Sequence, residues 1–256
     1  MIEFTKKVIE HKYETEIKYY AISRNKDIER KERNFRELDI DNLDSNICES
    51  ISRTKRKIKE YARNNDFDYF VTLTFDPKKF NSFSIDTVLK CTRLFLQKLR
   101  RSYPDLKYLL VPEYHADKQK IHLHGYIKGH LKLLVAENPL KNGEILKYKG
   151  KTVYNIAQWN YGYSTALKIG KSATDTLKCS SYITKYVTKD LLVSFNQKRY
   201  WCSKNLEIGK TILEQKLYAR DLEQLLESEK EVNPITFSNT FKNDFYACFT
   251  RQDSFD

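Results

Sequence analysis

The chain has 256 residues and a formal net charge of +12 at pH 7, from 46 basic and 34 acidic side chains. An excess of this size favours polyanionic partners, nucleic acid first and acidic membrane surfaces second. An aromatic content of 13% argues against a disordered chain, and 7 glycines with 5 prolines exclude fibrous and linker-like classes.

The five cysteines are scattered along the chain without a CxxC spacing. An odd, dispersed set is typical of reduced thiols rather than of disulfides or a zinc site. No apolar run approaches the roughly 20 residues that a membrane-spanning helix needs, and the N-terminus lacks the apolar stretch of a secretory signal. We therefore expect a nucleic-acid-binding protein of the cytoplasm.

The N-terminal segment is highly charged up to about residue 42. Alternation of apolar and polar residues from Tyr13 to Ile22 predicts a hairpin arm there. The next segment predicts a helix over about 46–63, capped by Ser45, with an apolar stripe on one face. The opposite face is basic, which fits a solvated surface as well as a DNA contact.

The centre of the chain carries the clearest strand pattern. Tyr69 to Phe75 alternates, with Phe70, Thr72 and Thr74 on one side of the predicted strand. Pro112 implies a bulge or a sheet edge in the strand that contains it. The elements expected after Phe75 are a helix from Ser84 or Asp86 to about Arg101, strands over Lys107–His115 and Ile121–Ile127, a helix over Cys179–Leu192, a short strand over Arg199–Ser203 and a helical region from about Asn205 to Lys230.

The order β-α-β-β-α-β predicts an α+β fold with a central antiparallel sheet and helices packed mainly on one face. Three parts are expected. Residues 1–44 form an N-terminal extension with the hairpin arm, residues 45–206 form the central domain, and residues 207–256 form a helical C-terminal extension with a polar tail.

Two histidines in the third predicted strand share one face. His122 and His124 are residues i and i+2, so both imidazoles project side by side. If this strand and the one before it form a hairpin about Asp117-Lys118, opposed residues sum to 235 and Glu113 faces His122. A carboxylate and two imidazoles then form a divalent-metal site with open positions. His115 is an alternative third ligand, and ordinary hydrogen-bonded histidines are the alternative to a metal site.

The predicted helix over Cys179–Leu192 carries two tyrosines. Tyr182 and Tyr186 are neighbours at i and i+4, with Lys185 and Lys189 on the same side. A tyrosine hydroxyl can attack a phosphodiester as a covalent nucleophile, and nearby ammonium groups favour the phenolate and the developing negative charge. Two tyrosines wedged at the margin of a core are the alternative interpretation.

Three segments together resemble the motifs of HUH endonucleases, and more narrowly those of rolling-circle replication initiators of small single-stranded DNA phages and related plasmids. They are Phe70-Val-Thr-Leu-Thr-Phe75, Ile121-His-Leu-His-Gly-Tyr126 and the tandem Tyr-x-x-Lys-Tyr-x-x-Lys that starts at Tyr182. The resemblance covers roughly residues 45–206 and includes Trp159-Asn-Tyr-Gly162. The doubled tyrosine is the phage-type signature.

The resemblance implies an enzyme that nicks one strand of single-stranded origin DNA, stays on the 5′ end through a phosphotyrosyl link and leaves a 3′-hydroxyl primer. It implies that Glu113, His122 and His124 bind Mg²⁺ or Mn²⁺. It implies that Tyr182 and Tyr186 are the nucleophiles. The implied partners are the replication origin and a host helicase and polymerase, in the cytoplasm of a bacterial cell.

Three other interpretations stay open. An RRM-like sheet would bind single-stranded RNA or DNA without cutting it. Two histidines and a carboxylate also occur in iron(II) oxygenases. A conjugative relaxase or a transposase would share the HUH chemistry with a different biological role. The origin sequence and the order in which the tyrosines act are not predicted.

Overall fold

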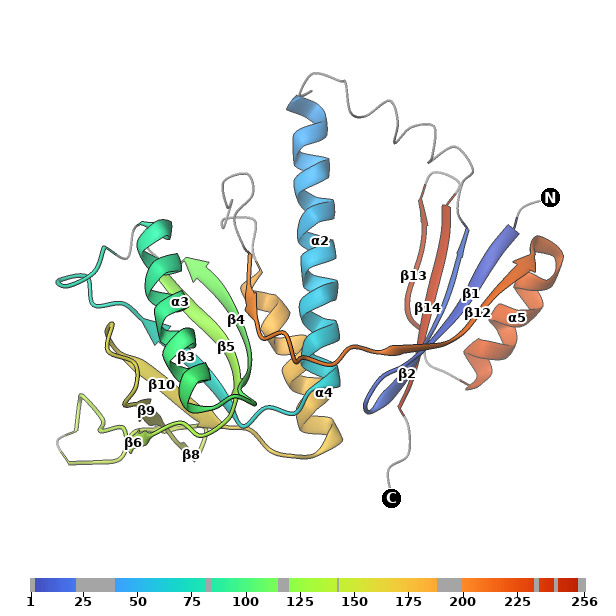
Figure 1. Ribbon diagram of the computed structural model, residues 1–256. Helices are drawn as coiled ribbons and strands as arrows, with labels where there is room; N and C mark the ends of the chain where they lie inside the picture. The colour runs from blue at the N-terminus through green and yellow to red at the C-terminus, as the bar shows by residue number, and fades with distance from the viewer. Residues whose placement is uncertain are drawn as a thin grey trace. The chain divides into compact units, whose positions relative to one another are not determined.

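A computed structural model describes residues 3–21, 40–81, 84–114, 120–141, 143–187, 199–232, 235–241 and 244–252 of the chain (Figure 1). Contacts between residues divide the chain into two compact units. Ile47–Glu207 form one unit, and Met1–Asn46 together with Ile208–Asp256 form the other. Among the described helices, none combines the length and the apolar character needed to cross a membrane.

The unit formed by Ile47–Glu207 is built on an antiparallel sheet with the strand order β11-β4-β5-β3-β10-β9-β6 (Figure 1). Its described strands are β3 (Tyr69–Thr74), β4 (Lys107–Tyr114), β5 (Ile121–Lys128), β6 (Leu133–Val135), β9 (Tyr154–Ile156), β10 (Ser164–Lys168) and β11 (Trp201–Cys202), with β7 (Lys147–Tyr148) and β8 (Lys151–Thr152) as a separate hairpin. The helices are α2 (Ile40–Asn64), α3 (Ile85–Ser102), α4 (Ala173–Tyr182) and the 3-10 helix η2 (Ile183–Tyr186). The predicted α+β class and antiparallel sheet are confirmed, and the architecture is consistent with an HUH/RRM-like fold.

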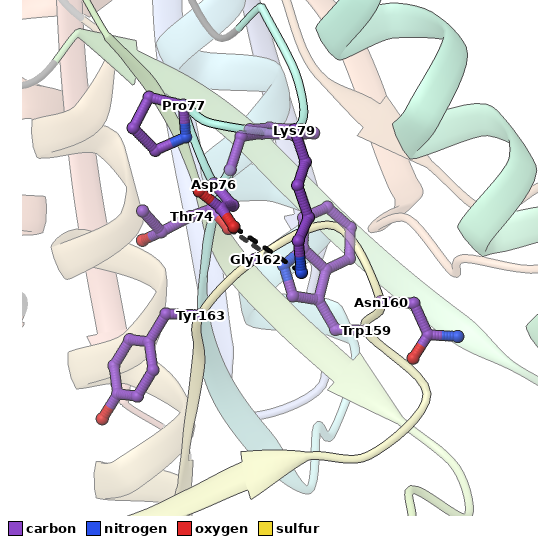
Figure 2. A pocket seen from close by; sticks show the side chains of 9 residues that line it. Thr74, Asp76, Pro77, Lys79, Trp159, Asn160, Gly162 and Tyr163 are labelled. Atoms are coloured by element: carbon purple, nitrogen blue, oxygen red, sulfur yellow. Dashed lines mark hydrogen bonds and ion pairs between the residues drawn. The ribbon is translucent and has the colours of Figure 1, made fainter.

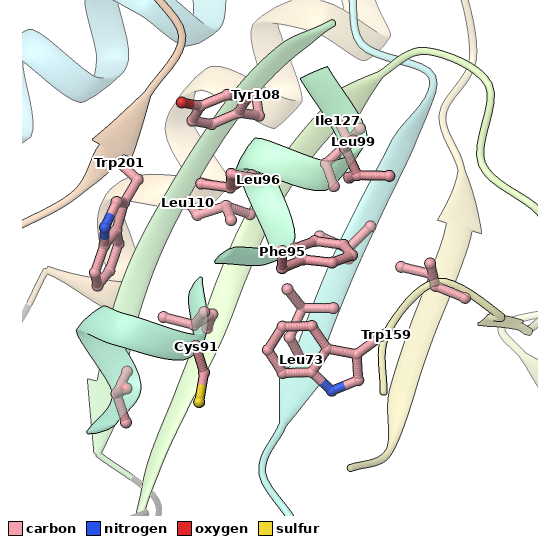
Figure 3. Packing of buried hydrophobic residues seen from close by; sticks show 14 of the residues in the cluster. Leu73, Cys91, Phe95, Leu96, Leu99, Tyr108, Leu110, Ile127, Trp159 and Trp201 are labelled. Carbon is pink, nitrogen blue, oxygen red and sulfur yellow. The ribbon is translucent and has the colours of Figure 1, made fainter. Parts of the chain in front are cut away.

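Helix α3 covers one face of this sheet. The Ser84 side chain caps it by accepting a hydrogen bond from the Thr87 N–H, as the sequence predicts. Its buried residues recur at helical spacing and pack against the strands (Figure 3). Trp159 joins the same core, with its ring centroid 5.0 Å from that of Phe95. The apolar residues of this core include Val71, Leu73, Val88, Phe95, Leu96, Leu99, Leu110, Leu123 and Ile127.

The opposite face of the sheet is covered as well. Strand β4 is buried from Tyr108 to Pro112, so it presents apolar side chains to both sides, as a central strand does. Leu109 and Val111 pack in a second cluster with Ile58 of α2 and Ile183 of η2. Helices therefore lie against both faces, whereas we predicted them mainly on one. The period of α2 predicts its apolar stripe but not which face that stripe covers.

The helix that carries the tyrosines differs from its prediction. It was expected over Cys179–Leu192 but begins at Ala173, after the N-cap Ser172. The α-helix ends at Tyr182 and continues as the tighter helix η2. The later part of the predicted helix lies outside the described residues.

The ends of the chain form a second antiparallel sheet with the order β12-β1-β2-β14-β13. Its described elements are β1 (Glu3–Glu10), β2 (Glu14–Ala21), β12 (Lys210–Tyr218), α5 (Ala219–Val232), β13 (Ile235–Phe241) and β14 (Asp244–Gln252). β1 and β2 form a hairpin, as predicted. The helix expected from about Asn205 is wrong in its first half, because β12 is a strand paired with β1. Long-range pairing overrides the helix propensity of this segment.

Gly125 lies where β5 passes close to β4. A Cβ at this position would overlap the carbonyl oxygen of Leu109 and come 2.8 Å from Cα of Leu110. We expect Gly125→Ala to lower the free energy of unfolding by about 1–3 kcal/mol, as overpacked core substitutions do. Urea denaturation measures the change.

The control for this substitution is Lys128→Ala, because Lys128 is exposed on the same strand. It should change the free energy of unfolding by less than about 0.5 kcal/mol. Equal stability of Gly125→Ala and the unsubstituted protein would contradict the close approach of β5 to β4.

Candidate functional site

Neighbouring strands place the candidate metal ligands on one face of the sheet. Strand β5 lies between β4 and β3, and its register pairs His122 with Glu113 on one side and with Thr74 on the other. His124 is paired with Thr72. The predicted register, in which Glu113 opposes His122, is confirmed. Because side chains alternate along a strand, these five residues project from the same face.

The two threonines hold the histidine rings. Thr74 Oγ1 lies 3.1 Å from His122 Nδ1, and Thr72 Oγ1 lies 3.1 Å from His124 Nδ1. The two imidazole rings are nearly parallel, with an interplanar angle of 8°. A hydrogen bond at Nδ1 fixes the orientation of a ring and assigns Nε2 as the nitrogen that would bind a metal.

Glu113 also reaches diagonally to His124, whose Nε2 lies 3.0 Å from Glu113 Oε2. Burial, with a smaller contribution from His122, lowers the pKa of His124 to about 4. The Glu113 carboxylate by itself would favour the imidazolium, but the loss of hydration outweighs it. The His124 ring is therefore neutral at pH 7, which is the form that binds metals.

The segment with the tyrosines is seated on the same face of the sheet. Ile183 and Val187 are buried in the cluster that contains Val111 and Tyr126. The Tyr126 hydroxyl donates a hydrogen bond of 2.9 Å to the carbonyl oxygen of Cys179. These apolar contacts and this bond fix the end of α4 and the helix η2 over β4 and β5.

Seated in this way, the tyrosines meet the histidines. The Tyr186 ring stacks on His124, with centroids 4.1 Å apart and planes 10° apart. The Tyr186 hydroxyl donates a hydrogen bond of 2.9 Å to the Tyr182 hydroxyl. Burial, together with the bond to Tyr182, raises the pKa of Tyr186. Tyr182 is more open, with 39% of its surface exposed.

Phe70 is a member of this site to which the sequence analysis gave no role. Its ring centroid lies 5.5 Å from that of Tyr182, 6.2 Å from that of Tyr186 and 6.3 Å from that of His124. Phe70 therefore forms an apolar floor between the imidazole and the phenols. The signal was present, because Phe70 alternates with Thr72 and Thr74, but using it required knowing that β3 pairs with β5.

The two predicted lysines stand differently. Lys185 is exposed, and its Nζ lies 5.1 Å from the centroid of the Tyr182 ring. Lys189 and the alternative ligand His115 lie outside the described residues. Within the described part of the chain, no three His, Cys, Asp or Glu side chains are grouped closely enough to hold a metal ion. The metal site therefore stays a prediction.

Comparison with known proteins adds one finding. Residues 68–191 match the model of a family of replication-associated proteins, the ORF2 family, over a segment just under half of the chain. No curated protein and no solved structure matches the chain. The matched segment contains Glu113, His122, His124, Tyr182 and Tyr186. The similarity supports a role in DNA replication as an initiator.

Proposed function

We propose that the chain is a rolling-circle replication initiator that nicks single-stranded origin DNA with a tyrosine nucleophile. The observation that carries this proposal is the stack of Tyr186 on His124, with ring centroids 4.1 Å apart and the Tyr182 hydroxyl hydrogen-bonded to that of Tyr186. Two phenols thus lie over an imidazole and a carboxylate, inside the segment that is similar to replication-associated proteins. A purely structural pair of tyrosines would need no such partners.

In the proposed reaction, the phenol oxygen of Tyr182 or Tyr186 attacks the phosphorus of a phosphodiester. The bond from phosphorus to the 3′ oxygen breaks as the bond to the phenol oxygen forms. The phenol loses its proton, and the leaving 3′ oxygen takes one up. The products are a 5′-phosphotyrosyl link and a 3′-hydroxyl that primes synthesis. Attack of a 3′-hydroxyl on the link reverses the step and rejoins a strand without ATP.

The donor set fits a divalent ion, Mg²⁺ or Mn²⁺, held by Glu113, His122 and His124. Glu113 Oε2 and His124 Nε2 are 3.0 Å apart, and adjacent ligands on an octahedral ion are separated by about 3.0 Å when its bonds are about 2.1 Å long. A bound ion would polarise the scissile phosphate as a Lewis acid. The task of Thr72 and Thr74 is to hold the two rings in the orientation that presents Nε2.

Positive charge is the second requirement of the proposed reaction, because a pentavalent phosphorus centre is more negatively charged than its surroundings favour. Lys185 stands beside the Tyr182 ring, and Lys189 is proposed for the same task. The net charge of +12 supports binding of a polyanion. We propose a host helicase, which would expose the strand, and a host polymerase, which would extend the 3′-hydroxyl, as partners in the bacterial cytoplasm.

The nucleophile assignment predicts a covalent adduct. Incubation of the full chain with single-stranded oligonucleotides and Mn²⁺ should give a protein–DNA species that survives SDS, and Tyr182→Phe/Tyr186→Phe should abolish it because no phenol oxygen remains. Denaturing electrophoresis of a labelled oligonucleotide measures this. The matched control is Tyr218→Phe, whose phenol is 46% exposed outside the site, and it should form the adduct normally.

The same assay separates the enzyme from a binding module. Fluorescence anisotropy should show that the double variant still binds the oligonucleotides, because the substitutions remove hydroxyl groups and not the basic surface. An adduct that persists in the double variant would disprove the nucleophile assignment. Tight binding with no cleavage of any strand by the unsubstituted chain would favour the RRM-like alternative.

The threonine contacts predict an effect on metal affinity. Thr72→Val/Thr74→Val keeps side-chain size but removes both hydrogen bonds to Nδ1, so we expect Mn²⁺ affinity to fall about 10- to 100-fold, as for other partners of metal-binding histidines. Isothermal titration calorimetry measures this without any reaction. Thr211→Val is the control, because Thr211 is exposed on β12. Unchanged Mn²⁺ affinity in the double variant would show that the threonines do not orient metal ligands.

A further inference from the structure

A pocket of about 450 Å³ opens beside the tyrosine and histidine site. One wall is the end of β3 with the turn that follows it, and the other is the segment from Trp159 to Tyr163 (Figure 2). Thr74 belongs to both the pocket and the site, because its hydroxyl contacts His122 Nδ1. A ligand in the pocket would therefore lie next to the group proposed to hold the scissile phosphate.

The segment from Trp159 to Tyr163 is held rigidly against β3. Trp159 Nε1 donates to the carbonyl oxygen of Thr74 at 3.1 Å. The N–H groups of Thr74 and Asp76 donate to the carbonyl oxygens of Tyr163 and Tyr161 at 2.8 and 2.9 Å. Gly162, with φ of 155°, packs so closely that a Cβ would overlap the Thr74 carbonyl oxygen. A rigid wall of this kind lowers the entropy lost when a ligand binds.

Side chains of this segment divide into anchors and exposed groups. Trp159 is buried, and Tyr161 packs on it with ring centroids 5.0 Å apart. Asn160 and Tyr163 project outward on either side of Trp159 (Figure 2). The Tyr163 ring is 51% exposed. Within the described residues, the Asn160 amide makes no hydrogen bond and the Tyr163 ring contacts no other aromatic ring.

The turn after β3 adds charged groups at the rim. Asp76 Oδ1 accepts a hydrogen bond of 3.0 Å from the Lys78 N–H, which fixes the carboxylate. Asp76 Oδ2 lies 3.8 Å from the Lys79 ammonium. The Lys79 side chain is largely exposed, so its pairing with Asp76 is weak. The pocket thus offers a fixed carboxylate oxygen, an open amide, an exposed aromatic face and an exposed cation.

This combination matches an unpaired nucleobase with its phosphate. Single-stranded nucleic acids are recognised by stacking of bases on aromatic rings, by hydrogen bonds to base edges and by cations at the backbone. Amide and carboxylate oxygens accept hydrogen bonds from exocyclic amino groups. Adenine, cytosine and guanine carry such a group and thymine does not.

We propose that this pocket is a base-reading subsite, in which Asn160 and Asp76 read the edge of one unpaired base that flanks the scissile phosphate, and Tyr163 provides the stacking face. The inference rests on the proposed function for the identity of the substrate. The subsite selects a base with an exocyclic amino group over thymine. It gives the nicking site part of its sequence specificity through residues that take no part in the chemistry.

The test uses the full chain and an oligonucleotide library with random bases around the nick, with sequencing of covalently captured ends. The unsubstituted chain should disfavour thymine at one flanking position by about tenfold, the effect of a good amide–base contact. Asn160→Ala should remove that discrimination while still cleaving. Tyr163→Ala should raise KM about tenfold, the effect of losing one stacked base, with little change in kcat.

Two controls keep the result interpretable. Tyr218→Ala removes a tyrosine of similar exposure that lines no part of the pocket, and it should leave KM and base preference unchanged. Tyr163→Phe keeps the aromatic face and should restore normal KM, which a merely structural role of the hydroxyl would not predict. Unchanged base preference in Asn160→Ala, with normal cleavage, would overturn the subsite and leave the nicking proposal intact.

A second measurement covers failure of the proposed function. If no adduct forms with the unsubstituted chain, anisotropy with short single-stranded oligonucleotides that differ at one position still tests the subsite. Asn160→Ala should then lose about tenfold discrimination against thymine in Kd. Identical Kd values for all four bases in the unsubstituted chain would overturn the subsite.

Discussion

The candidate site depends on the hydrogen-bonded contacts between β3 and β5. Each threonine of β3 faces the Nδ1 atom of a histidine across the strand pair, at 3.1 Å in both cases. A slip of one residue would move every one of these side chains to the opposite face. What prevents it lies on that opposite face, where Val71, Leu73 and Leu123 are fully buried. The apolar core under α3 thus fixes the register of the polar site.

Much of this could be predicted from the sequence because the relevant strands alternate strongly. The hairpin sum placed Glu113 opposite His122 correctly, since that relation depends only on local pairing of β4 and β5. Which strand flanks β5 on its other side depends on a contact over some fifty residues of chain, so the roles of Phe70, Thr72 and Thr74 could not be derived from periodicity. The strands β6 and β9 were missed because strands this short have no detectable period.

The ends of the chain show the limit of local patterns more strongly. Segments more than 190 residues apart form one sheet, with β12 paired to β1 and β14 paired to β2. Its core includes Tyr19, whose hydroxyl donates a hydrogen bond of 3.0 Å to Glu229 of α5. A hairpin of two strands is marginally stable alone. The N-terminal and C-terminal segments therefore stabilise each other and are not independent extensions, although the charge and helix propensity of each suggested that they were.

The site divides its chemical groups between rigid and adjustable parts of the fold. The imidazoles and Glu113 stand on central strands, where backbone pairing on both sides of β5 limits movement. The phenols stand at the change from α4 to η2, where only the apolar anchors Ile183 and Val187 hold the segment. Under the proposed reaction this division is required. The electrostatic environment of the phosphate must stay fixed while each tyrosine in turn replaces the other, and two hydroxyls 2.9 Å apart need only a small rotation to exchange places over the same imidazole.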